Sequence, residues 1–125
     1  MSKQLTKAEE QIMQVLWSLK EASVKEIIEH LSEPKPAYNT VSTIIRILES
    51  KEFVGHKAVG RGFEYHPIVE KETYSNQRLH KLMDGYFNGS FKSMVSFFVK
   101  ENNMDVSELE AVLKEVNKKN TKDYE

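Results

Sequence analysis

Cysteine is absent from the 125 residues of this chain. The absence excludes disulfide bonds and thiolate metal sites, and it is typical of a reducing compartment, so we expect a cytoplasmic location. Long apolar runs are also missing, and no segment approaches the roughly 20 residues that a membrane-spanning helix needs. The polar start, MSKQLTKAEEQ, has no signal-peptide core. We therefore expect no insertion into a membrane.

Motifs for catalysis or cofactor binding are lacking as well. The chain contains no Gly-rich phosphate loop, no nucleophile elbow and no clustered pair of carboxylates. Its four histidines (His30, His56, His66 and His80) do not fall at metal-ligand spacing, so we interpret each as a structural or exposed residue. The sequence predicts neither an enzyme nor a bound metal or cofactor.

Net charge is also small, at −1, but the charges are unevenly distributed. Between Pro34 and Gly62 there are five basic residues (Lys35, Arg46, Lys51, Lys57 and Arg61) against two acidic ones (Glu49 and Glu52). That segment is three units positive within an otherwise acidic chain. Because local charge decides where a polyanion docks, the segment is a candidate nucleic-acid surface.

What is present is a soluble globular composition, with 39% hydrophobic and 30% charged residues, enough for one domain and a short appendage. Two capping boxes, at Thr6–Glu9 and Ser23–Glu26, predict helix starts. Apolar residues at three- and four-residue steps predict a first helix to about Lys20 and a short second one. After a proline-containing break, a third helix is predicted from about Ala37 or Tyr38 to Lys51.

From Phe53 onward the pattern changes to short β-rich runs. Phe53–Val59 and Phe63–Pro67 are joined by Gly60-Arg61-Gly62, which is typical of a hairpin with a flexible tip. Three helices followed by a two-stranded ribbon predict a winged helix-turn-helix. The predicted fold is thus mainly α with a small β-hairpin wing, and residues 1–70 form a predicted DNA-binding domain.

Residues 71–125 are predicted to be helical, with Asn88-Gly89 ending one helix. Their apolar stripes carry large side chains that are too numerous for so small a core, and exposed patches of that kind usually mark an interface. We expect an isologous homodimer formed by this second domain, although the helices could instead fold back on the winged helix. The predicted interface comprises Leu79, Leu82, Met83, Tyr86, Phe87, Phe91, Met94, Val95, Phe98, Leu109 and Leu113.

The third helix has a polar face opposite its apolar stripe of Val41, Ile44, Ile45 and Leu48. Its short hydrogen-bonding side chains suit a helix that lies in the major groove of DNA, where threonine or isoleucine methyls can also touch a thymine methyl. The predicted base-reading residues are Asn39, Thr40, Ser42, Thr43 and Arg46. The predicted contacts to the DNA backbone, including the wing, are Lys7, Lys35, Lys57 and Arg61.

Two other functions remain open on these residues. A winged helix can serve protein–protein interaction without binding DNA. Alternatively, the aromatic residues of the second domain could line a pocket for a small ligand, although aromatic stripes at helical spacing are more often core.

Tyr38, just before the third helix, could stack on a sugar or wedge the turn.

Three segments, LTKAEEQIMQVLW at Leu5–Trp17, NTVSTIIRILESKEFV at Asn39–Val54 and FNGSFKSMVSFFVKEN at Phe87–Asn102, resemble the penicillinase-repressor family of BlaI, MecI and CopY regulators. The resemblance runs from about Leu5 to Lys119. It implies a homodimeric repressor that binds an inverted-repeat operator with its third helix in the major groove. It also implies release of the operator when a membrane-bound sensor protease leads to cleavage within the helical region.

Three features depart from the pattern of this family. The copper-responsive branch carries a cysteine cluster near its C-terminus, which this chain lacks. In the β-lactam-responsive branch the cleaved bond is Asn-Phe, and the matching pair here, the candidate cleavage region, is Phe97-Phe98. A family arginine late in the third helix is matched by Ile47, one position after Arg46, so the operator sequence does not carry over.

Overall fold

The computed structural model describes residues 4–124, and the side chains of residues 4–118 among them. The chain divides into two units, a winged-helix unit at Met1–Arg78 and a C-terminal unit at Leu79–Glu125. The division falls within a helix, eight residues after the 70/71 boundary at which the sequence pattern changes.

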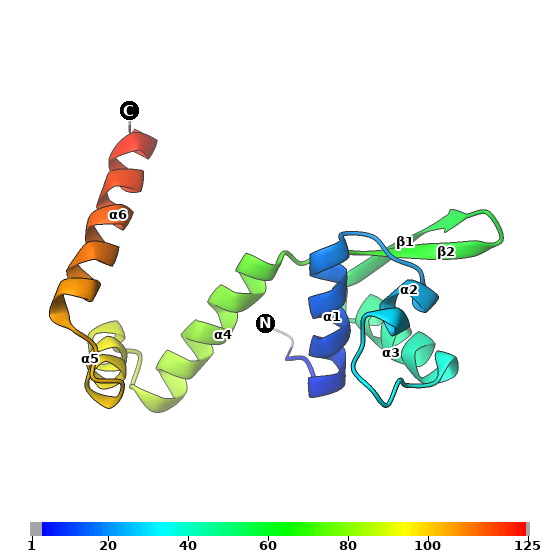
Figure 1. Cartoon of the computed structure of the whole chain (residues 1–125), viewed down its shortest axis with the longest axis horizontal. Helices are drawn as coiled ribbons and strands as arrows, with labels where there is room; N and C mark the ends of the chain where they lie inside the picture. The colour runs from blue at the N-terminus through cyan, green and yellow to red at the C-terminus, as the bar shows by residue number, and fades with distance from the viewer. Residues whose placement is uncertain (1–3, 125) are drawn as a thin grey trace. The chain divides into compact units, whose positions relative to one another are not determined.

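The winged-helix unit contains three helices and a hairpin, followed by the start of a fourth helix (Figure 1). Its fold confirms the predicted class, mainly α with a β-hairpin wing. The elements are α1 (Lys7–Leu19), α2 (Val24–Glu29), α3 (Tyr38–Ser50), β1 (Val54–Val59), β2 (Gly62–Pro67) and the first turns of α4 (Lys71–Tyr86). The predicted strand limits differ from these by one residue.

Both predicted capping boxes are present. The Thr6 hydroxyl accepts a hydrogen bond from the Glu9 amide at 3.2 Å, and the Glu9 carboxylate accepts one from the Thr6 amide at 2.8 Å. Ser23 and Glu26 repeat the arrangement at the start of α2, at 3.2 and 3.0 Å. These bonds satisfy amides that have no partner inside the helix, and they therefore fix where each helix begins.

The core of the winged-helix unit lies between the three helices. Its largest fully buried side chains come from α1, α2 and α3, at the three- and four-residue spacing that the sequence showed: Ile12, Met13, Leu16, Ile27, Val41, Ile45 and Leu48. Burial of each such side chain contributes on the order of 1.5–3 kcal/mol. Because α3 presents Val41, Ile45 and Leu48 to this core, its opposite face is left to solvent.

The hairpin is antiparallel, with His56 opposite Tyr65 in its register. The base of the hairpin gains a third, one-residue strand, because Ala22 and Tyr65 exchange backbone hydrogen bonds at 3.0 and 2.8 Å. These bonds attach the wing to the connection between α1 and α2. The attachment holds the wing beside the helices.

The first turns of α4 belong to the winged-helix unit because of one aromatic side chain. Tyr74 is only 4% exposed, and its ring lies 5.8 Å from that of Trp17 and 5.7 Å from that of Phe53. Trp17 in turn donates its indole N–H to the Val69 carbonyl at 2.9 Å. This aromatic cluster fixes the chain from Val69 to Tyr74 on the winged-helix core.

The C-terminal unit contains the rest of α4, then α5 (Phe91–Glu101) and α6 (Val106–Tyr124). The Phe87 and Phe97 rings are 5.5 Å apart. None of the side chains described between residues 79 and 118 is buried. In a single copy, this unit therefore has no core of its own. Across residues 4–124, no helix combines the length and apolar character that crossing a membrane demands.

Candidate nucleic-acid interface

The outer face of α3 is exposed along its whole length. Asn39, Thr40, Thr43 and Arg46 are all exposed, whereas Ser42 is half-buried. Ile47, an apolar residue on the same side of the helix, is 41% exposed. The predicted face is thus present, but it is rotated away from Ser42 and toward Ile47.

The wing contacts the C-terminal end of α3. The His56 ring of β1 forms a hydrogen bond with the Glu49 carboxylate of α3. Strand alternation places Phe63 and Tyr65 on the same side of the hairpin as His56, and their rings lie 5.0 and 5.9 Å from the His56 ring. Burial raises the pKa of the Tyr65 phenol, and the Glu49 carboxylate nearby raises it further. This side of the wing therefore faces α3.

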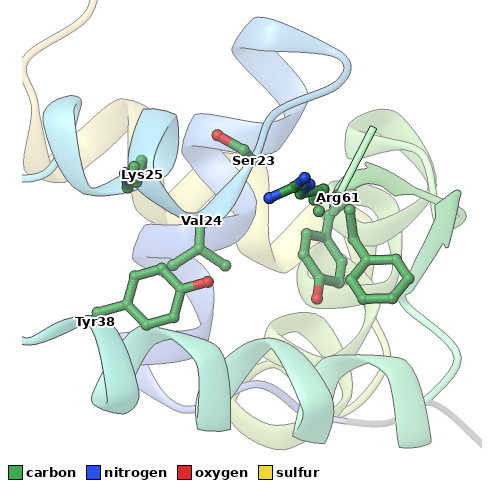
Figure 2. Close-up of a pocket in the computed structure, with 8 residues that line it drawn as sticks. Ser23, Val24, Lys25, Tyr38 and Arg61 are labelled. Atoms are coloured by element: carbon green, nitrogen blue, oxygen red, sulfur yellow. The ribbon is translucent and has the colours of Figure 1, made fainter. Parts of the chain in front are cut away.

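A groove of about 340 Å³ lies between the wing and the first residues of α2 and α3. Figure 2 shows the Tyr38 ring beside Val24 and the Arg61 guanidinium on the opposite side of the groove. Aromatic and basic side chains line it together: Lys25, Tyr38, Arg61, Phe63 and Tyr65, with Ser23, Val24 and Gly62. Tyr38 and Phe63 are about half exposed, at 53% and 50%. Such a groove offers a polyanionic backbone both cations and hydrogen-bond donors.

The predicted backbone contacts do not share one environment. Lys57 lies on the side of the hairpin away from α3 and pairs with Glu21 at 3.0 Å, a contact that raises the pKa of its ammonium group. Lys35 donates to the carbonyls of Glu29 and Leu31 at 3.1 and 2.7 Å and so caps the end of α2. Lys7 is exposed at the start of α1.

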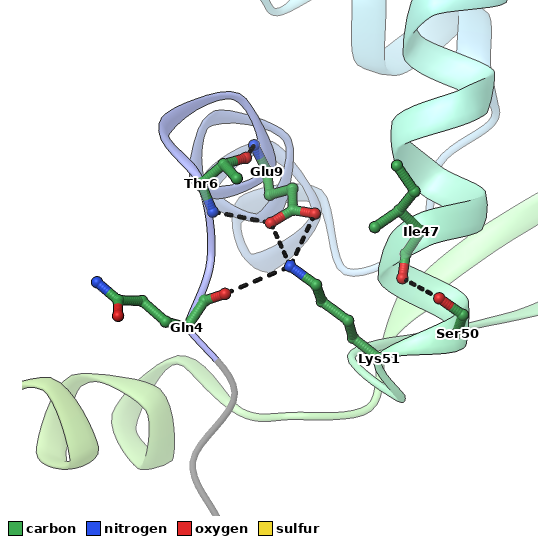
Figure 3. A network of polar contacts seen from close by, with 6 residues as sticks. All are labelled: Gln4, Thr6, Glu9, Ile47, Ser50 and Lys51. Carbon is green, nitrogen blue, oxygen red and sulfur yellow. Dashed lines mark hydrogen bonds and ion pairs between the residues drawn. The ribbon is translucent and has the colours of Figure 1, made fainter.

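Lys51, which contributes to the predicted positive segment, is also engaged inside the unit, where it pairs with Glu9 (Figure 3). By contrast, Arg46 and Arg61 are exposed and form no ion pair with any side chain that the structure describes. Within the predicted positive segment, the charge available to a ligand is therefore carried by the two arginines, and Lys25 adds to it at the groove.

Among the basic and aromatic residues of the groove, the sequence pattern did not single out Lys25, Phe63 or Tyr65. The alternation of the hairpin would have placed Phe63 and Tyr65 on one face. No local pattern shows that this face lies against α2 and α3, because the contact depends on the Ala22–Tyr65 pairing across 43 positions of the sequence. For the side chains described, no three His, Cys, Asp or Glu residues come close enough to hold a metal ion.

The fold and the exposed helix beside a cationic groove define a winged-helix DNA-binding protein. The family model described as penicillinase repressor matches residues 5–118 of the chain. The chain therefore belongs to the penicillinase repressor family, a family of DNA-binding transcriptional repressors rather than enzymes.

The chain is also similar in sequence to individual proteins over most of its length. The chain is 28% identical to the penicillinase repressor of Bacillus licheniformis over 116 residues, which cover 90% of this chain and 91% of the relative. It is 28% identical over 117 residues to the methicillin resistance regulatory protein MecI of Staphylococcus aureus strain N315, covering 93% and 95%. The solution structure of the DNA-binding domain of the repressor BlaI is 30% identical, with a TM-score of 0.51, and covers 59% of this chain and 94% of that domain.

Proposed function

We propose that the protein is a sequence-specific transcriptional repressor that binds an inverted-repeat DNA operator as a homodimer. The observation that carries the proposal is the exposed outer face of α3, which lies beside a groove lined by basic and aromatic side chains. A helix in the major groove needs close approach and short polar side chains, and that face supplies both.

In this proposal α3 enters the major groove, with Asn39, Thr40, Ser42, Thr43 and Arg46 near the base edges. Arg46 can form a bidentate contact with guanine, and Asn39 can do so with adenine. Ser42, being half-buried, reaches the bases from the edge of the face rather than from its centre.

One strand of the DNA backbone then runs along the groove between the wing and α3. Lys25 and Arg61 supply positive charge from its two sides, and the Tyr38 hydroxyl is a donor to phosphate. Lys7 contributes at the start of α1. We leave Lys35 and Lys57 out of the backbone contacts, because one caps α2 and the other pairs with Glu21.

The dimer is proposed for the C-terminal unit, within the helical segment 71–125. The absence of buried side chains from residues 79 to 118 supports it, because large apolar groups left in water forgo roughly 1.5–3 kcal/mol each. Tyr86, Phe91 and Phe98 are 80%, 67% and 56% exposed in one copy. Aromatic side chains that are exposed to this extent are more suited to contact with a second protein surface than to lining a ligand pocket. The proposed interface includes Leu79, Leu82, Met83, Tyr86, Phe87, Phe91, Met94, Val95, Phe98, Leu109 and Leu113.

Release of the operator is proposed to follow cleavage in α5, at or near Phe97-Phe98, through a sensor-protease pathway. Both side chains are more than half exposed in one copy, at 54% and 56%. Cleavage there would separate α6 from the winged-helix unit, and loss of the dimer would remove the second reading helix. Because Phe97 stands where the family has asparagine, mass spectrometry of fragments from induced cells must locate the cut.

The proposal is tested by selecting bound duplexes from a random-sequence pool with the full-length chain. The expected result is an inverted repeat with half-sites separated by whole turns of about 34–36 Å. Arg46→Ala is the matched variant, and we expect it to relax the preference at one symmetric pair of positions. Failure to enrich any sequence at low salt would contradict the proposal.

A further inference from the structure

We infer that α3 reads thymine through methyl groups, with Thr43 and Ile47 as the specificity-determining pair. The inference rests on the proposed function and names one base class within it. Three observations carry it: the use of the Thr43 hydroxyl inside the helix, the exposure of Ile47, and the position of the two side chains one turn apart.

The hydroxyl of Thr43 is already a donor within α3. Its Oγ1 donates to the Asn39 carbonyl at 2.8 Å, a bond that a threonine makes to the preceding turn. A hydroxyl has one proton, so Thr43 has none left for a base. The groups it offers outward are its γ-methyl and the acceptor lone pairs of its oxygen.

The same holds for the next hydroxyl along this face. Ser50 donates its proton to the Ile47 carbonyl at 2.8 Å (Figure 3). The face is therefore less rich in donors than its sequence indicates, since two of its hydroxyl protons are used by the helix itself. Two side chains between Thr43 and Ser50 are exposed, those of Arg46 and an apolar residue.

The apolar residue is Ile47, with 41% of its surface exposed. It lies four positions after Thr43, which places the two on the same side of α3 as neighbours. An isoleucine in a helix strongly prefers one χ1 rotamer, so little conformational entropy is lost when another surface covers Ile47. Thr43 and Ile47 thus form a small methyl surface on a face whose other exposed residues, from Asn39 to Ser50, are polar.

In the major groove only thymine presents a methyl group, at C5, and an apolar side chain is its natural contact. Each buried methyl contributes about 0.8 kcal/mol, which is about a fourfold change in affinity. The geometry therefore points to a thymine in each half-site that is recognised by its methyl group rather than by its hydrogen-bonding edge.

The experiment uses the full-length chain and the operator enriched from the random pool. Each symmetric pair of thymines is replaced by uracil, which removes the methyl and leaves base pairing unchanged. For the wild-type protein we expect one or two pairs at which uracil weakens binding by about fourfold per methyl. For Ile47→Ala, binding to the thymine operator should fall, and the thymine-to-uracil ratio at that position should approach one.

Two substitutions separate the methyl from the hydroxyl at Thr43. Thr43→Val keeps the methyl surface and should keep the discrimination, whereas Thr43→Ser keeps the hydroxyl and should reduce it. Ile68→Ala is the matched control, because Ile68 is 55% exposed but lies outside α3. It should leave the ratio unchanged.

An operator that binds equally well with uracil at every position would overturn this inference and leave the proposed function intact. The same conclusion follows if Ile47→Ala retains the full thymine preference. Failure of the wild-type chain to enrich any duplex would overturn the proposed function, and this inference with it.

Discussion

Lys51, the C-cap residue directly after α3, forms an ion pair with Glu9 in the first turn of α1, with 2.8 Å between Nζ and Oε1 (Figure 3). The Lys51 ammonium also donates to the Gln4 carbonyl at 3.3 Å. Glu9 is 4% exposed, so its carboxylate is held almost wholly within the protein. The pair joins the end of the proposed recognition helix to the start of the chain's first helix.

The protonation of Glu9 should therefore control part of the stability of the winged helix. Burial raises the pKa of the Glu9 carboxyl, but hydrogen bonds from Lys51 and the Thr6 backbone outweigh it and leave the pKa below its ordinary value of 4.5. A lowered pKa in the folded state means that the stabilisation is present above pH 4.5 and is lost as the pH falls through the folded value.

We predict that Glu9→Gln lowers the free energy of unfolding by about 1–3 kcal/mol at pH 7, because the Lys51 charge loses its partner. Urea unfolding at pH 7, 5 and 3.5 measures the effect. The difference between variant and wild type should be constant between pH 7 and 5 and smaller at pH 3.5. Glu10→Gln, on the neighbouring half-buried residue, is the control. A difference that grows on acidification would contradict the assigned role.

Two basic residues of the wing should behave differently toward DNA. Arg61 lines the groove, whereas Lys57 lies on the other side of the hairpin in a pair with Glu21. We predict that Arg61→Ala lowers the slope of log affinity against log salt by roughly one, for operator and random DNA alike. Lys57→Ala should change that slope much less. Fluorescence anisotropy titrations at several salt concentrations measure the slope for each variant. Equal effects of the two substitutions would show that the DNA backbone does not run along the groove.

Local signals were enough to predict most of the fold. The Thr6–Glu9 and Ser23–Glu26 boxes and the glycines around Arg61 are short patterns whose physical causes lie within a few residues. Tyr74 had no such signal, because its partners Trp17 and Phe53 are distant in sequence. Periodicity shows that a side chain is apolar on one face, but it does not show which core receives it.

The candidate site was predictable in part for the same reason. A helical wheel placed Asn39, Thr43 and Arg46 on an exposed face, since that depends only on α3. The wheel could not show which charges have partners. Lys51 is paired with a residue 42 positions away, and Lys57 with one 36 positions away. The positive surface of this segment is consequently smaller than its sequence indicates, and it is centred on the arginines.

The end of α3 offers a site where stability can be raised. Glu52 has a φ of +66° and follows the helix in a Schellman arrangement, in which the Phe53 amide donates to the Leu48 carbonyl at 2.9 Å. A left-handed conformation is costly for a residue with a Cβ and is free of that cost for glycine. We predict that Glu52→Gly raises the free energy of unfolding by about 0.5–1 kcal/mol in urea titrations. Glu52→Ala removes the same charge without relieving the backbone and should give no such gain.

The exposed aromatic residues of the C-terminal unit give the sharpest test of the dimer. Phe91 is 67% exposed in one copy, so Phe91→Asp should leave the fold of that copy intact. In the proposed dimer it would bury an unpaired carboxylate, and we expect the dissociation constant to rise at least about a hundredfold.

Sedimentation equilibrium measures this change, and operator affinity should fall toward that of a single half-site. Ser96→Asp introduces the same charge on the polar side of α5 and should leave the dimer unchanged. A Phe91→Asp protein that remains dimeric would show that another surface forms the dimer. In that case, the exposed apolar faces of α4, α5 and α6 would not be what holds the two recognition helices at the paired half-sites.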